Sequence, residues 1–242
     1  MEMKRFISCV LGITTILSAP LIVRADGFGI NTTRLIYPGE AKSINVTVRN
    51  TLTDTPYLVQ AAVSRQQDKQ EPAPFTVMPP IFRLEPQSVN QLRIVYNGSP
   101  LPADRESVFY FHATAIPGSK EPLNNTQGGI PAQVRFGVGN IIKLFYRPAS
   151  LGNSSSTAQK GLQFSSVAAG IKVTNPSPFY VSFSSVRVGN KKLALKSPAA
   201  LMLPPQGSYT WQMSPLPAKG TKVQWQTIND SGGIDAFSAN LP

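Results

Sequence analysis

The chain has 242 residues, a formal net charge of +11 and 41% hydrophobic residues, enough for one large or two ordinary globular domains. It contains one cysteine, which excludes a disulfide framework. It also contains only one histidine, which argues against a histidine-based metal site. The basic excess suits an anionic partner, although the basic residues are scattered along the chain, apart from the pair Lys191–Lys192.

The first 25 residues have the pattern of a secretory signal peptide. Lys4 and Arg5 precede a short apolar run, and Val23 and Ala25 stand before the expected cleavage after residue 25. Polar and proline residues interrupt the run, which argues against a transmembrane anchor. Because Cys9 lies in this segment, the exported chain would have no disulfide. Its net charge would be +9, and export argues against nucleic acid as the anionic partner.

Short runs with alternating apolar and polar residues follow, separated by frequent prolines and glycines. Alternation with a period of two predicts β-strands with one covered face, and the spacing of the runs is typical of a β-sandwich. No run of ten or more residues has a helical period. The expected strands are 43–50, 57–65, 90–97, 107–117 and 132–148 in the first half, then strands within 162–175, 179–190, 191–195, 208–213 and 222–230.

Two connecting segments interrupt this pattern. Residues 118–131 are rich in Gly and Asn and predict a long hairpin loop, while the small polar residues at 149–161 predict a linker or loop. Each half of the exported chain has about the length of one immunoglobulin-like sandwich. We therefore expect an all-β fold of two immunoglobulin-like β-sandwich domains, residues 26–148 and 149–242, after the signal peptide 1–25.

The strand predicted at 132–148 carries an unusual lysine. Lys143 stands between Ile142 and Leu144, where burial would be costly unless an anionic group met it. Earlier in the same strand, four apolar residues alternate on one face: Ala132, Val134, Phe136 and Val138. The segment therefore predicts a strand that binds a partner.

Groups suited to catalysis are scarce. His112, the only histidine, lies in an aromatic run, which favours a structural role over a catalytic triad or a metal site. Asp104 and Glu106 are the only carboxylates close together, so a glycosidase-type pair stays an alternative, although their segment is typical of a turn. No glycine-rich phosphate loop is present. We expect a binding protein that is not an enzyme and needs neither cofactor nor metal.

Five motifs occur in order along the exported chain: TTRLIYPGE (32–40), PLPADRESVFYF (100–111), IIKLFYRP (141–148), NPSPFYV (175–181) and INDSGG (228–233). With these motifs the chain resembles a periplasmic pilus (fimbrial) chaperone of the chaperone–usher pathway. The resemblance implies a boomerang of two immunoglobulin-like domains. It also implies a function: capping pilus subunits by donor-strand complementation in the periplasm and delivering them to an outer-membrane usher.

The resemblance assigns roles to three sets of residues. Arg34 and Lys143 would anchor the C-terminal carboxylate of the subunit. Glu106, Arg147 and Asp230 would form a charge cluster between the domains. The donor strand would fill the open groove of the subunit with Ile130, Ala132, Val134, Phe136 and Val138.

The residues leave open the class of pilus protein, the chaperone subclass and self-association. A structural pilus subunit or adhesin is the alternative, although such proteins typically have an N-terminal extension of alternating residues and a cysteine pair. The loop before the donor strand and the missing cysteines leave both the short-loop and the long-loop subclass open. An exposed donor strand would also allow the free chaperone to self-associate.

Overall fold

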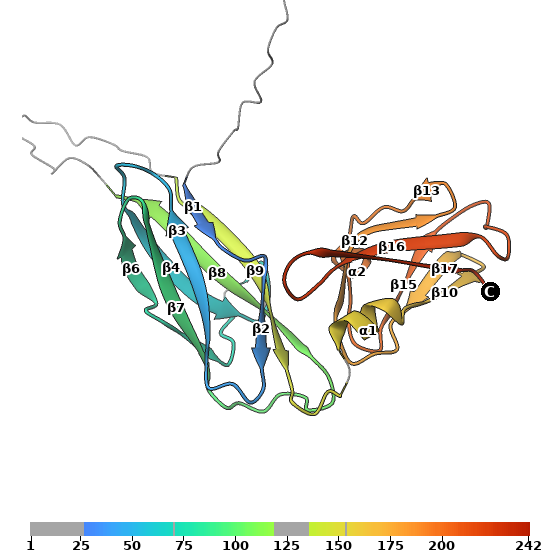
Figure 1. Cartoon of the computed structure of the whole chain (residues 1–242), viewed down its shortest axis with the longest axis horizontal. Helices are drawn as coiled ribbons and strands as arrows, with labels where there is room; N and C mark the ends of the chain where they lie inside the picture. Colours follow the sequence, from blue (N-terminus) through green and yellow to red (C-terminus); the bar gives the residue numbers. More distant parts are fainter. Residues whose placement is uncertain (1–26, 70, 119–135, 153) are drawn as a thin grey trace, which may run out of the picture.

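The computed structural model describes residues 27–69, 71–118, 136–152 and 154–242. The chain folds into two β-sandwiches set at an angle, joined by the segment between β9 and α1 (Figure 1). This confirms the predicted all-β fold with two immunoglobulin-like domains in a boomerang. The predicted signal peptide and the predicted donor residues Ile130, Ala132 and Val134 lie outside the described residues.

The N-terminal domain consists of two sheets. One has the strand order β1-β3-β7-β5 and the other β2-β9-β8-β4-β6. The pairing of β2 with β9 is parallel, whereas the other described pairings in this domain are antiparallel. The strands are β1 (Phe28–Ile30), β2 (Arg34–Pro38), β3 (Ile44–Asn50), β4 (Tyr57–Ser64), β5 (Phe75–Met78), β6 (Ile81–Leu84), β7 (Ser88–Tyr96), β8 (Ser107–Pro117) and β9 (Val138–Arg147).

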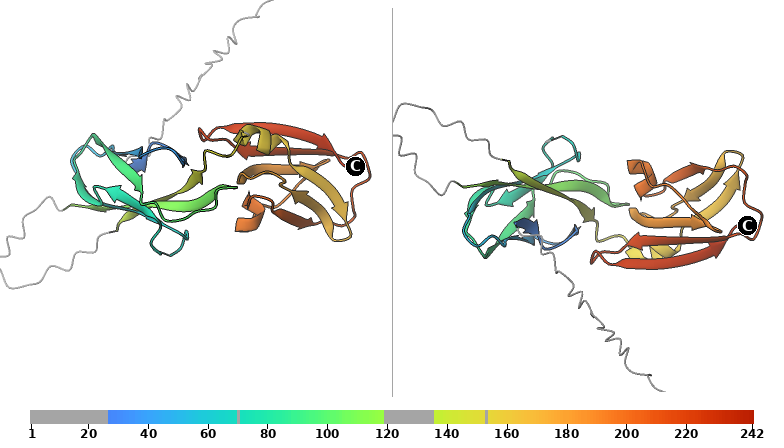
Figure 2. Two further views of the ribbon diagram at one scale, coloured as in Figure 1. Left: turned by 90° about the horizontal axis from the view of Figure 1, so that it is seen from below. Right: turned by 90° about the horizontal axis from the view of Figure 1, so that it is seen from above.

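The C-terminal domain is a second, smaller sandwich, whose two layers are visible in Figure 2. One sheet has the order β10-β11-β15 and the other β13-β12-β16-β17, with β14 paired to β12. Its elements are α1 (Ser155–Lys160), β10 (Gln163–Val167), β11 (Gly170–Thr174), β12 (Val181–Val188), β13 (Lys191–Lys192), α2 (Pro198–Leu201), β14 (Met202–Leu203), β15 (Ser208–Gln212), β16 (Lys222–Ile228) and β17 (Ile234–Asn240).

Each sandwich has its own hydrophobic core. In the N-terminal domain, the fully buried Tyr37 packs its ring against Phe75 and Tyr146. In the C-terminal domain, Trp225 packs against Phe164. Separate cores are what two domains require. The predicted boundary between residues 148 and 149 stays a prediction, and it falls just after β9.

The linker predicted at 149–161 is wrong in its second half, where the structure has the helix α1. The Ser154 side chain caps this helix by accepting a hydrogen bond from the backbone N–H of Thr157, 3.2 Å away. Only Ala158 and Gln159 are buried, and six residues are too few to show a helical period. The strand predicted at 191–195 is also too long, because β13 ends at Lys192.

Candidate functional site

The strand β9 has one open edge along its first half. On one side it pairs with β8 through Val138–Tyr146. On the other side it pairs with β2, but only from Lys143 onward. Among the described residues, no strand therefore pairs with this second edge over residues 138–142. Exposed N–H and C=O groups of this kind offer a template for a strand from another chain.

The core-facing side of β9 becomes uncovered toward the same end. Leu144 is fully buried, and Ile142 packs against the N-terminal core. Four residues before Ile142, on the same face, Val138 is 44% exposed. Phe136, which lies on this face just before the strand, is 82% exposed. We call Phe136 and Val138 the open stripe. The stripe extends the hydrophobic core of the domain into solvent, beside the open strand edge.

Two cations lie side by side where β9 meets β2. Arg34 and Lys143 are directly paired in the parallel register of these strands. The Arg34 guanidinium is buried, lies 5.5 Å above the Phe145 ring and donates from Nη1 to the Ile228 carbonyl at 2.8 Å. Its Nε is buried and has no hydrogen-bond partner among the described residues. Within the described part of the chain, neither cation has a carboxylate within ion-pair distance.

Burial and mutual repulsion disfavour the charged forms of this pair. The pKa of Lys143 is lowered by burial and then by the neighbouring Arg34 charge. Burial also lowers the pKa of Arg34, while the more distant Asp230 and Glu106 oppose this effect. An incoming carboxylate would offset the repulsion and give the Arg34 Nε an acceptor. The pair is therefore suited to binding a single anionic group.

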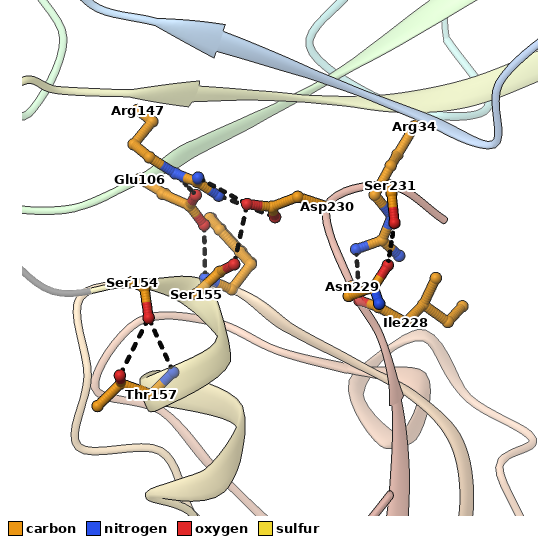
Figure 3. A network of polar contacts seen from close by, with 11 residues as sticks. Arg34, Glu106, Arg147, Ser154, Ser155, Thr157, Ile228, Asn229, Asp230 and Ser231 are labelled. Atoms are coloured by element: carbon orange, nitrogen blue, oxygen red, sulfur yellow. Dashed lines mark hydrogen bonds and ion pairs between the residues drawn. The ribbon is translucent and has the colours of Figure 1, made fainter. Parts of the chain in front are cut away.

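A charge cluster connects the two domains close to Arg34 (Figure 3). Arg147 at the end of β9 donates from Nε to Glu106 Oε1 at 2.8 Å. Its two terminal nitrogens donate to Asp230 in the turn between β16 and β17, at 2.8 and 3.0 Å. The second Glu106 oxygen accepts from the Tyr180 backbone N–H at 2.8 Å. The structure therefore brings together the three residues that were predicted to lie between the domains. We call Glu106, Arg147 and Asp230 the interdomain cluster.

The two carboxylates of the cluster have opposite pKa directions. Burial raises the pKa of Glu106, whose side chain is 2% exposed, although the Arg147 charge opposes the effect. Burial also tends to raise the pKa of Asp230, but hydrogen bonds from Arg147 and Ser155 more than offset it and lower this pKa. Asp230 is the more exposed of the two at 38%. Arg147 is thus the counterion that keeps a buried Glu106 charge tolerable.

Sequence reasoning missed several partners at this junction. Ser155 donates to Asp230 at 2.9 Å from α1, in the segment interpreted as a linker. The Ile228 carbonyl and the Tyr180 N–H are backbone groups, so their side chains carry no signal for these contacts. Gly232 had a usable signal in the sequence, since it lies in the INDSGG motif. In the structure its φ is +86°, which favours glycine. A Cβ at Gly232 would lie 2.4 Å from Thr33 Oγ1 in the other domain.

The only histidine of the chain is part of a hydrogen bond inside the N-terminal domain. His112 Nε2 and the buried Ser64 hydroxyl share a hydrogen bond of 2.6 Å within the N-terminal domain. No group of three or more His, Cys, Asp or Glu side chains in the described ranges could hold a metal ion. Nor does any helix in those ranges have the length and hydropathy to cross a membrane.

The open strand edge, beside two cations that have no carboxylate partner in the described ranges, defines a protein-binding scaffold built on two sandwich domains. The comparisons agree with this class. Residues 27–152 match the N-terminal domain model of the PapD pili and flagellar-assembly chaperones. Residues 157–239 match the C-terminal domain model of the PapD pili assembly chaperones. The chain belongs to the family of pilus-assembly chaperones.

Curated relatives show the same likeness over nearly the whole chain. The probable fimbrial chaperone SfmC of Escherichia coli (strain K12) is 37% identical over 213 residues, which covers 87% of this chain and 86% of the relative. The chaperone protein LpfB of Salmonella typhimurium (strain LT2) is 34% identical over 236 residues, covering 96% and 95%. Relatives of this kind are chaperones, and they do not favour the alternative of a structural subunit or adhesin.

Solved structures extend the likeness to three dimensions. The Salmonella enterica SafB chaperone, in complex with the SafA pilin, matches with a TM-score of 0.73 at 32% identity. The match covers 90% of this chain and 98% of SafB. The E. coli chaperone DraB matches with a TM-score of 0.72 at 30% identity, covering 88% and 98%.

Proposed function

We propose that this protein is a periplasmic chaperone that caps pilus subunits by donating a strand, and that it is not an enzyme. The observation that carries the proposal is the open edge of β9 beside the open stripe. A subunit that lacks its final strand would pair with this edge through main-chain hydrogen bonds, while the stripe fills its groove. Full burial of a side chain such as Phe136 is worth about 1.5–3 kcal/mol before ordering costs.

Arg34 and Lys143 would anchor the C-terminal carboxylate of the subunit and thereby set the register of the added strand. Register matters because a slip of one residue turns every side chain to the opposite face. The buried, unpartnered Nε of Arg34 supports this role, since an anion would satisfy it. Ile130, Ala132 and Val134 would continue the donor strand beyond the open stripe. The interdomain cluster would fix the angle between the domains around the anchor.

We also propose where this protein acts and which partners it meets. Residues 1–25 would direct export to the periplasm and be removed, leaving domains 26–148 and 149–242. The capped subunit would then pass to an outer-membrane usher, and nucleic acid would have no role. The open edge of β9 would also allow two free copies to associate, since exposed strand edges pair readily.

The test is co-expression with the pilin encoded beside the gene, followed by isolation of a one-to-one periplasmic complex. Lys143→Ala should weaken capture by roughly 2–5 kcal/mol, mainly because the subunit carboxylate loses one of its two counterions. Phe136→Asp should abolish groove filling while leaving the free protein folded, because Phe136 is 82% exposed.

Two variants provide matched controls. Lys172→Ala removes another half-buried lysine in the C-terminal domain, and Val89→Asp places a carboxylate at an apolar position that is 66% exposed. Both should capture the pilin as wild type does. Equal capture by all four variants would reject the proposed site, and absence of any complex with wild type would reject the proposed function.

A further inference from the structure

Asn140 interrupts the apolar face of β9 with a polar side chain. On this face it follows Phe136 and Val138 and precedes Ile142, which packs on the core. Its register partner on β8 is Ala113, which is fully buried. Asn140 therefore stands at the boundary where the closed core of the domain ends and the open stripe begins.

The amide nitrogen of Asn140 is buried and has no hydrogen-bond partner among the residues that the structure describes. Such groups are rare in folded proteins, and each is costly relative to a satisfied donor. The described residues contain only two others, Arg34 Nε and Ser182 Oγ. Of the three, Arg34 and Asn140 both lie along the surface that would receive a subunit. An apolar residue at position 140 would avoid the cost, which suggests that the donor is satisfied in a bound state.

We infer that Asn140 is a specificity-determining residue for subunit capture, and that it donates a hydrogen bond to a polar side chain near the subunit's C-terminus. The inference rests on the proposed function, and the position of the acceptor follows from geometry. A subunit whose C-terminal carboxylate lies at Arg34 and Lys143 must extend back along the open edge toward Val138, so its strand runs parallel to β9. Asn140 precedes Lys143 by three residues, or about 10 Å along a strand.

The acceptor therefore lies about three residues before the C-terminus of the subunit. Main-chain groups along the shared edge are occupied by the strand pairing, so a free acceptor must come from a side chain. Ser, Thr, Asn and Gln offer one, whereas Ala, Val or Leu would leave the Asn140 donor unsatisfied. The chaperone would thereby favour subunits with a polar residue at this position over subunits with an apolar one.

The experiment measures capture affinity in the full-length chaperone with its neighbouring pilin and with a pilin variant. In the pilin variant, the polar residue three positions before the C-terminus is replaced by Ala. Wild type should bind this variant about tenfold more weakly, since one hydrogen bond to a buried donor is lost. Asn140→Leu, which keeps the branching at Cγ but has no donor, should bind both pilins with nearly equal affinity. Asn140→Thr keeps a donor and should retain part of the discrimination.

The melting temperature of the free protein separates the inference from a structural role for Asn140. Free Asn140→Leu should have a melting temperature at or above that of wild type, because an unsatisfied buried donor is removed, whereas a structural role predicts a lower one. Ile141→Ala changes an exposed residue on the opposite face and should leave the discrimination unchanged. Discrimination that persists in Asn140→Leu, or that wild type lacks, would overturn the inference while the proposed function stands. Absence of capture by wild type would overturn both.

Discussion

Arg147→Met should strongly destabilise the protein, because it leaves the Glu106 carboxylate buried without its counterion. The Glu106 side chain is 2% exposed and its ion pair with Arg147 measures 2.8 Å. Removing one partner of such a buried pair costs about 3–5 kcal/mol. The Asp230 partner is 38% exposed and water can solvate it, so its loss should add little. We expect about 3 kcal/mol, near the lower end of that range.

Urea denaturation followed by circular dichroism measures this loss over both domains. Trp211 and Trp225 lie in the C-terminal domain, so tryptophan fluorescence reports on that domain separately. The neighbouring Arg105 provides a matched control, since it forms a 2.8 Å ion pair with Asp104 but both side chains are 41% or more exposed. Arg105→Met should cost far less stability than Arg147→Met, because water solvates both partners of this exposed pair.

The loss in Arg147→Met should shrink as the pH falls. Burial raises the pKa of Glu106, so the folded state binds this proton more readily than the unfolded state does. Ionisation of such a group lowers stability as the pH rises through its folded-state pKa. Without Arg147 this pKa rises further, and protonation at acidic pH then removes the uncompensated charge. A loss equal to that of Arg105→Met, or one independent of pH, would refute the reasoning.

Two further predictions concern the anchor and the joint between the domains. Burial and Arg34 lower the pKa of Lys143 below 10.5 in the free protein, and a bound carboxylate would raise it again, so subunit binding takes up a proton. The affinity of wild type for the subunit, measured by titration calorimetry, should therefore fall as the pH rises toward 10.5. The affinity of Lys143→Arg should stay the same at all alkaline pH values. An unchanged wild-type affinity would count against the proposed anchor. Gly232→Ala should lower stability by about 1–2 kcal/mol more than Gly220→Ala in urea denaturation, because both glycines have positive φ but only a Cβ at Gly232 meets Thr33. Equal losses would show that this contact between the domains has room to adjust.

The sequence predicted those strands whose residues alternate between core and solvent. β4 is an example, with buried residues at every second position from Tyr57 to Val63. β2 was not predicted as a strand because Arg34 and Leu35 are both buried, which removes the alternation. β17 was missed because none of its residues is buried, although the half-buried Phe237 packs against Trp225. Periodicity therefore detects strands with one clearly covered face, and it fails where both faces are covered or where neither face is more than partly covered.

The candidate site depended on information that periodicity does not contain. Lys143 attracted attention by itself, as a charge within an apolar run. Its pairing with Arg34 depends on the register of two strands far apart in the chain, and only the resemblance to a family indicated it. Asn140 gave no signal in the sequence, because a single Asn in a strand is unremarkable until its buried nitrogen is seen to lack a partner.

The interdomain cluster draws its three charges from separate parts of the chain. Glu106 precedes β8, Arg147 ends β9, and Asp230 follows β16, almost at the end of the second domain. Contacts between such distant positions form late, because much of the intervening chain must be ordered first. A molecule still being synthesised can therefore complete its first sandwich before its joint exists. The capacity to hold a client at a fixed angle would thus appear abruptly, once β16 and β17 have folded, and not gradually as the chain emerges.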